Sequence, residues 1–363
     1  MKVCIVAGAR PNFIKVAPII RAIHAAKVNG KDIDFDLVYT GEESDKTLEE
    51  SLFTDLSIPR PDAFLGVECE RMNELTGRVM FEFDKYLDAH PADVVIVVDD
   101  LASTMAVSIV SKKRGLMLAH LVAGTRSFDI NMPKEINRLV IDGLSDLLFI
   151  AGAGANNIVA REGAETSRVY MVGNILIDTL RFNYTRMVRP DILSELNLVD
   201  GDYIVFTLNR KALIAHPENL QRMLTAMIQN AAGSPIVAPL RADAAAAVKS
   251  CLDSLPAHFH LVSPLSYLEF GYLTAHARGI VTDSGNVAEE ATFNRVPCIT
   301  LNSYTEHQET VTVGSNLLVG EDADKLGKAV KDIVSGTWKK CAIPERWDGR
   351  SAERIVSILL ENK

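Results

Sequence analysis

The sequence has few aromatic residues, few cysteines and no long apolar run. Only 6% of its 363 residues are aromatic, and its five cysteines contain no CxxC pair. Scattered cysteines in an odd number indicate neither a disulfide framework nor a zinc site. No apolar run approaches the roughly 18 residues of a membrane-spanning helix, and the N-terminus does not have the pattern of a signal peptide. We therefore expect a cytoplasmic protein with no membrane partner.

Basic residues are outnumbered by acidic ones. The chain has 38 Lys and Arg against 47 Asp and Glu, a formal net charge of −9. This balance argues against a nucleic-acid partner, although it leaves room for a local basic pocket. The remaining composition, 48% apolar and 23% charged, is that of a globular protein. We expect Cys4 and Cys298, which lie in apolar runs, to be buried.

Apolar segments and helical patterns alternate along the chain. The run DVVIVV at residues 93–98 is typical of a central strand buried on both faces of a parallel sheet. The alternation restarts after a polar connector at 185–201. We predict an α/β fold with two Rossmann-like, doubly wound domains facing each other across a cleft. The expected domains are 1–180 with the C-terminal helix 350–363, and 190–349.

The stretch VTDSGNVAEEA, at residues 281–291, marks the junction of a strand with a helix. Ser284 and Gly285 lie at this junction, where free backbone N–H groups and the helix dipole favour an anion. Gly285 has no Cβ to block a ligand, and Ser284 adds a hydroxyl donor. A ligand-free capped helix is the alternative. Carboxylates placed to accept hydrogen bonds from a ribose diol follow at Glu289 and Glu290.

Charged residues follow two strands of the first domain. We expect Arg10 in the turn 8–12 after the first strand, at the ligand edge of the sheet, before a helix over 13–26. Lys15 lies about a turn later and could reach the same anion. Asp99 and Asp100 end the strand at 93–98 and are functional candidates. The alternatives are a solvated loop charge for Arg10 and helix N-caps for the two aspartates.

Short motifs follow one another along almost the whole chain. They are GARPNFIK at 8–15, VVDDLAST at 97–104, HLVAGTR at 120–126, PKEINR at 133–138, GNILID at 173–178 and TDSGNVAEE at 282–290. In order, they resemble the motifs GTRPE-x-IK, VHGDTTTT, HVEAGLRT, PEE-x-NR, GNTVID and TDSGGIQEE of the UDP-N-acetylglucosamine 2-epimerases. The resemblance implies two domains of the GT-B type, a UDP-sugar in the interdomain cleft, no metal or other cofactor, and a homodimer.

The resemblance also implies a reaction. A base removes the proton at C2 of the sugar while UDP leaves C1, and UDP adds back to the unsaturated sugar with C2 inverted. Such a reaction needs carboxylates near C2 and donors near the leaving phosphate. By resemblance, Asp100 and Glu135 are the acid/base pair, and Asn209 stabilises the leaving diphosphate. The same resemblance assigns UDP-sugar binding to Arg10, Lys15, Arg138, Arg210, Ser284, Gly285, Asn286, Glu290 and His307.

Several positions depart from the family pattern. Val122 replaces the acid of HVEAG, and Asn209 replaces the histidine of an HRRE motif. His216 could supply an imidazole instead, or be a surface residue. The HxNP motif, which serves an activating second UDP-sugar in bacterial members, is absent at 239–243.

We expect epimerisation of UDP-GlcNAc to UDP-ManNAc, or of a related UDP-sugar. The alternatives are a variant that hydrolyses the substrate to UDP and free sugar, and a UDP-sugar-binding protein without turnover. A GT-B glycosyltransferase would not explain the motifs at 8–15, 133–138 and 173–178 together.

Overall fold

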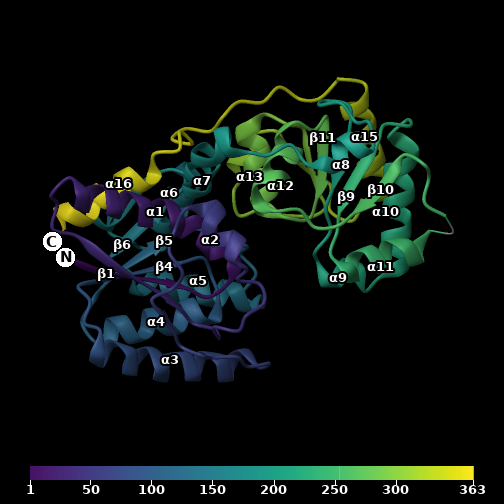
Figure 1. Ribbon diagram of the computed structural model, residues 1–363. Helices are drawn as coiled ribbons and strands as arrows, with labels where there is room; N and C mark the ends of the chain where they lie inside the picture. Colours follow the sequence, from purple (N-terminus) through teal and green to yellow (C-terminus); the bar gives the residue numbers. More distant parts are fainter. Residues whose placement is uncertain (253, 363) are drawn as a thin grey trace. The chain divides into compact units, whose positions relative to one another are not determined.

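The computed structural model describes residues 1–252 and 254–362, which fall into two compact units (Figure 1). Unit 1 comprises Met1–Phe182 and Glu345–Lys363, and unit 2 comprises Asn183–Pro344. No helix in the described part of the chain is long and apolar enough to cross a membrane.

Unit 1 is built on a seven-stranded parallel sheet in the order β3-β2-β1-β4-β5-β6-β7. All five residues of β4 are buried, so the apolar run seen in the sequence forms a central strand as predicted. The strand order reverses between β1 and β4, and in open α/β sheets ligands bind at such a switch point. The strands are β1 Lys2–Ala7, β2 Asp34–Tyr39, β3 Ala63–Phe64, β4 Val94–Val98, β5 Met117–Leu121, β6 Leu147–Ile150 and β7 Val169–Met171.

Helices cover both faces of this sheet. Helices α3 and α4 share a core with β1, β2 and β4, and Figure 1 shows them on the face away from α1 and α16. The C-terminal helix α16 packs against α1. The helices are α1 Arg10–Val28, α2 Glu50–Leu56, α3 Met72–Ala89, α4 Ala102–Lys113, α5 Pro133–Leu144, α6 Ala153–Arg161, α7 Ile175–Asn183 and α16 Ser351–Glu361.

Unit 2 has a six-stranded parallel sheet in the order β10-β9-β8-β11-β12-β13, with its switch point between β8 and β11. The strands are β8 Ile204–Phe206, β9 Ile236–Pro239, β10 Phe259–Val262, β11 Gly279–Thr282, β12 Cys298–Thr300 and β13 Asn316–Leu318. The helices are α8 Asp191–Glu195, α9 Lys211–Ile214, α10 Pro217–Asn230, α11 Ala242–Cys251, α12 Tyr267–Ala275, α13 Gly285–Asn294, α14 Glu309–Thr312 and α15 Ala323–Val334.

The start of α1 differs from the prediction. The helix begins at Arg10, so Arg10 lies in its first turn and not in a preceding loop. The Asn12 Oδ1 accepts the backbone N–H groups of Gly8 at 2.9 Å and Ala9 at 3.1 Å, which stabilises the early start. The buried positions expected for Cys4 and Cys298 are confirmed, and both thiols are free.

Candidate functional site

The end of β4 is joined to the first turns of α1. The Asp99 carboxylate accepts Lys15 Nζ at 2.6 Å and Asn12 Nδ2 at 2.8 Å. Asp99 adopts the left-handed backbone region, with φ of +59°, which is uncommon for a residue other than glycine. Lys15 is buried, so an anion reaching its ammonium would share it with Asp99.

Asp100 and Glu135 contact the same guanidinium. Arg138 lies on α5, and its Nη2 and Nε donate to Asp100 Oδ2 at 2.6 and 2.8 Å. Its Nη1 donates to Glu135 Oε2 at 3.2 Å. All three side chains are buried. The N-cap alternative for the two aspartates is wrong, because the N-cap of α4 is Leu101 and no side chain caps that helix.

Both carboxyl groups are held in the ionised form. Burial alone would raise the pKa of Asp100, but the charges of Lys134 and Arg138 bring the pKa below its usual range. Burial also acts to raise the pKa of Glu135, and hydrogen bonds from Ser127 and Phe128 outweigh it. A lowered pKa keeps both carboxyl groups in the proton-accepting form at neutral pH, and it also makes them weaker bases than an unperturbed carboxylate.

Glu135 also holds the loop that precedes α5. Its Oε2 accepts the backbone N–H and the hydroxyl of Ser127, both at 2.9 Å, and its Oε1 accepts the backbone N–H of Phe128 at 3.1 Å. Both Glu135 oxygens are therefore engaged within unit 1. Asp100 Oδ1, by contrast, is bound by the half-exposed Lys134 at 3.2 Å.

A charge network that the motifs did not predict joins β5 to α5 and the end of α6. His120 on β5 lies with Nδ1 at 2.6 Å from Asp142 Oδ1, and Arg126 Nη1 lies at 2.8 Å from Asp142 Oδ2. Arg126 also binds Glu162 at 2.5 Å. Polar residues inside apolar runs, such as His120 in Met117–Leu121, were the signal that could have revealed it.

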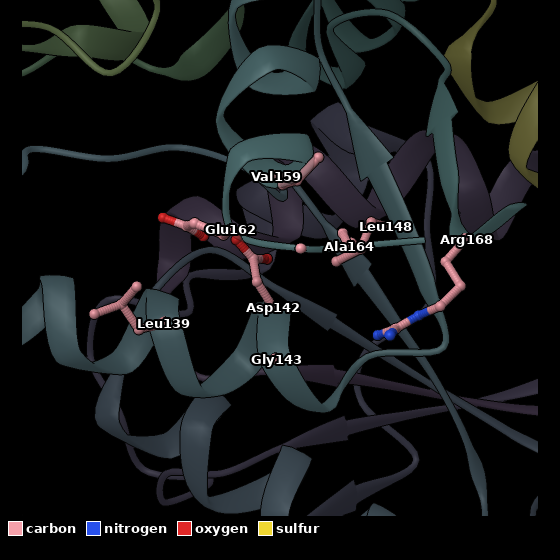
Figure 2. A pocket seen from close by; sticks show the side chains of 9 residues that line it. Leu139, Asp142, Gly143, Leu148, Val159, Glu162, Ala164 and Arg168 are labelled. Carbon is pink, nitrogen blue, oxygen red and sulfur yellow. The ribbon is translucent and has the colours of Figure 1, made fainter. Parts of the chain in front are cut away.

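A pocket of about 390 Å³ adjoins the network (Figure 2). Figure 2 shows Asp142 and Glu162 between Leu139 and Arg168, and both carboxylates bind Arg126. The pocket is lined by residues of α5, β6 and the end of α6.

Val122 stands directly after β5, where the family motif has an acid. Its φ is +69°, and a β-branched residue in the left-handed region is strained. The isopropyl group offers no proton and no acceptor. The turn therefore has an unusual backbone conformation at Val122, although the valine side chain cannot take part in proton transfer or hydrogen bonding.

In unit 2, the predicted strand–helix junction is confirmed at the start of α13. Ser284 is the N-cap residue, and its hydroxyl accepts the Val287 N–H at 3.5 Å. Gly285 is exposed, and a Cβ there would meet no atom within 4 Å. Asn286 follows in the first turn. Backbone N–H groups of a first turn suit an anion.

The turn after β8 is tied to the same junction. Asp283 Oδ2 accepts the backbone N–H groups of Asn209 at 2.7 Å and Arg210 at 2.5 Å. Asn209 itself is exposed. The guanidinium of Arg210 binds Glu321 at 2.5 Å, so its charge is matched within unit 2. His216 is exposed and precedes α10, in line with the surface alternative.

Two buried carboxyl groups follow on α13. Burial, with the neighbouring charge of Glu289, raises the pKa of Glu290 to about 8. The Glu289 Oε2 lies 3.6 Å from Nε2 of His307, which is also buried. Glu290 is therefore largely protonated at neutral pH.

The predicted residues thus fall into two groups, one in each unit. In unit 1, Asp100, Glu135 and Arg138 are in direct contact, and Lys15 binds the neighbouring Asp99. Among the residues that the structure describes, no group of three or more His, Cys, Asp or Glu side chains is placed to hold a metal ion. In unit 2, Asp283 ties Asn209 and Arg210 to the junction formed by Ser284, Gly285 and Asn286. Glu290 lies farther along α13, and His307 pairs with Glu289 on the same helix.

Comparison with known proteins gives consistent matches over the whole chain. The profile of the family described as UDP-N-acetylglucosamine 2-epimerase matches residues 26–360. The UDP-N-acetylglucosamine 2-epimerase of Methanocaldococcus jannaschii is 35% identical, covering 100% of both chains. The UDP-2,3-diacetamido-2,3-dideoxy-D-glucuronate 2-epimerase of Pseudomonas aeruginosa is 32% identical, covering 92% of this chain and 94% of the relative.

A solved structure gives the same match. The crystal structure of the Methanocaldococcus jannaschii UDP-GlcNAc 2-epimerase in complex with UDP-GlcNAc and UDP has a TM-score of 0.85 to this chain at 34% identity. The match covers 99% of this chain and 100% of the other.

Proposed function

Because this chain belongs to the UDP-N-acetylglucosamine 2-epimerase family, we propose that it epimerises C2 of UDP-GlcNAc, or of a related UDP-sugar. A base takes the proton from C2 as the C1–O bond to UDP breaks, giving UDP and an unsaturated sugar. UDP then adds back at C1, and C2 receives a proton on its other face. No external redox partner is needed, since atoms and electrons balance within the substrate.

The contact of Asp100 and Glu135 with one guanidinium supports this proposal most directly. Arg138 and Lys134 keep the Asp100 carboxylate ionised in a buried place, so it can accept a proton at neutral pH. We assign the base at C2 to Asp100, because its Oδ1 is bound by the half-exposed Lys134, a side chain that can move away. Glu135 would act as the partner acid/base. For this role its hydrogen bonds from Ser127 and Phe128 would have to break.

We assign the diphosphate to the start of α13. Ser284, Gly285 and Asn286 present a hydroxyl and first-turn N–H groups, which favour a phosphate. Asn209 lies on the neighbouring turn and can donate to a phosphate oxygen, but it cannot serve as an acid or base near pH 7. Arg10, Lys15, Arg138, Arg210 and His307 complete the proposed binding set, with Glu290 on the ribose.

We propose that the substrate is a 2-acetamido UDP-sugar. The relatives named above act on UDP-GlcNAc and on a diacetamido glucuronate. Val122 places an apolar group where the family motif has a carboxylate, which alters the charge offered to the sugar. A comparison of turnover on these two UDP-sugars decides between them.

Isotope exchange tests the reaction. Incubation with UDP-GlcNAc in deuterated water should place deuterium at C2, because the proposed base exchanges its proton with solvent. Accumulation of free UDP and free sugar would instead identify the hydrolysing variant. UDP binding without deuterium incorporation, repeated with the diacetamido glucuronate substrate, would identify a binding protein and contradict the proposal.

We further propose a cytoplasmic homodimer. Exposed apolar side chains gather on α5 and the loop before it, where self-association would remove them from water. Light scattering of the purified chain should give twice the monomer mass of 39.7 kDa. These residues are Phe128, Ile130, Ile136 and Leu139.

A further inference from the structure

His120 occupies a buried position between two hydrogen-bond acceptors. Its Nδ1 lies 2.6 Å from the Asp142 carboxylate, and its Nε2 lies 3.0 Å from the backbone carbonyl of Asp99. We propose that His120 is a doubly protonated positioning residue, which fixes the Asp99 carbonyl and thereby the direction of Asp100. The inference rests on the proposed function, in which Asp100 takes the proton from C2.

Neither acceptor can supply a hydrogen to the ring. A backbone carbonyl only accepts, and the Asp142 carboxylate already accepts the Gly124 N–H at 3.0 Å and the Arg126 guanidinium at 2.8 Å. Burial alone would raise the pKa of Asp142, but His120 and Arg126 hold it below its usual range. Each ring nitrogen must therefore carry its own hydrogen to make its contact.

The surrounding charges accommodate a cationic ring. Asp142 and Glu162 each carry one negative charge, and Arg126 lies between them. With His120 cationic, the charges of these four residues sum to zero; three of the four are buried, and Glu162 is exposed. Beyond the cluster, the Asp99 side chain pairs with Lys15 at 2.6 Å.

The contact with Asp99 controls the turn that presents Asp100. The left-handed conformation of Asp99 is held by its own N–H, which donates to the Leu121 carbonyl at 3.3 Å, and by the His120 Nε2–H on its carbonyl. That carbonyl belongs to the peptide bond joining Asp99 to Asp100. Without the ring hydrogen, this peptide can rotate and turn the Asp100 carboxylate away from the substrate.

Asp142 also lines the pocket in Figure 2, and this pocket provides a control position. Gly143 lines this pocket, is exposed, and has no atom within 4 Å of an added Cβ. Gly143→Ala therefore perturbs α5 next to Asp142 without touching the ring. We expect kcat in this variant to stay within about twofold, because no contact of the network changes.

Two amide substitutions separate the contacts of the ring. In His120→Asn the short amide can reach Asp142 but not Asp99, whereas in His120→Gln the longer amide can reach the Asp99 carbonyl. Both remove the positive charge, so loss of stability should be similar. We expect kcat for C2 exchange to fall about 100-fold in His120→Asn and at most about 10-fold in His120→Gln, with KM little changed in both.

The ring itself can be observed in the unchanged protein. NMR of ¹⁵N-labelled histidine, recorded at the pH of the exchange assay, should show a hydrogen on both nitrogens of His120. A ring nitrogen without a hydrogen, or equal losses of kcat in the two variants, would overturn the inference. If the unchanged protein exchanges no hydrogen at C2, the proposed function fails, while the NMR spectrum still decides the state of His120.

Discussion

The carboxyl-end edges of the two sheets hold their charges in different ways. In unit 1, Asp99 binds Lys15, and Arg138 binds both Asp100 and Glu135. In unit 2, Ser284 and Gly285 stand at an open helix terminus, and the buried Glu290 has a pKa raised to about 8. Unit 1 is therefore organised before a ligand arrives, which suits proton transfer. In unit 2, the donors at the start of α13 and the carboxyl group of Glu290 are placed to form hydrogen bonds with a ligand, which suits binding.

Asp100→Asn should have the largest effect and tests the catalytic side of this comparison. The amide still accepts a hydrogen bond from Arg138 but cannot take a proton, so C2 exchange should fall about 10³-fold. UDP affinity by calorimetry should change by less than about threefold. Asp146→Asn is the matched control, since it removes a carboxylate that pairs with Lys112 at 2.8 Å. Exchange by Asp100→Asn close to that of the control would remove Asp100 from the mechanism.

Glu290→Gln tests the buried carboxyl group of unit 2. The folded pKa of about 8 lies above the unfolded value of 4.5, so the folded state binds the extra proton between these pH values. Stability of the unchanged protein should therefore fall as pH rises from about 5 to 8. The variant should lack this loss and be more stable at pH 8 by an amount on the order of a few kcal/mol.

Chemical unfolding at pH 5 and pH 8 measures this difference. The two proteins should have similar stability at pH 5, where Glu290 is protonated in the folded state. Parallel pH profiles for the two proteins would show that Glu290 is not the titrating group.

Ser284→Ala and Arg10→Ala ask whether both units bind the nucleotide. Each removes a donor assigned to phosphate, so the Kd for UDP should rise about 10-fold in either variant. Ser266→Ala is the control, because it removes a serine N-cap of unit 2 on another helix, α12. If Arg10→Ala lowers exchange but leaves the Kd unchanged, Arg10 belongs with the catalytic charges of unit 1.

Activation by a second nucleotide should be absent, which is the smallest expected effect. The segment 239–243 joins β9 to α11 and carries no histidine. Rates measured against UDP-GlcNAc should follow a hyperbola, and added UDP-GlcNAc should not activate turnover of another UDP-sugar. Sigmoidal kinetics would show that unit 2 offers a second subsite.

Local pattern predicted much of the fold. The all-apolar β4 follows from burial on both faces of a sheet. The N-cap position of Ser284 could be predicted because serine is a preferred residue directly before a helix, where its hydroxyl accepts a backbone N–H. The start of α1 was missed because its N-cap, Ala9, has no capping side chain, and Asn12 reaches back in its place.

The candidate site was predictable only in part. Asp100 could be placed at a strand end, but its suspected capping role was wrong, since Arg138 and Lys134 bind its carboxylate. His120 and Asp142 were not recognised as partners. They lie 22 residues apart, on a strand and a helix, and no motif spacing relates them.

The order of apolar runs, turns and short motifs was enough to determine two parallel-sheet units and which residues lie at their carboxyl ends. Burying such runs leaves few alternatives, and strand ends follow from where the runs stop. Only the tertiary structure decided which charges meet, as when Arg138 reaches Asp100 across 38 positions. Contacts of this kind depend on sheet order and helix placement, which bring distant residues within a few ångströms without leaving a pattern in the sequence.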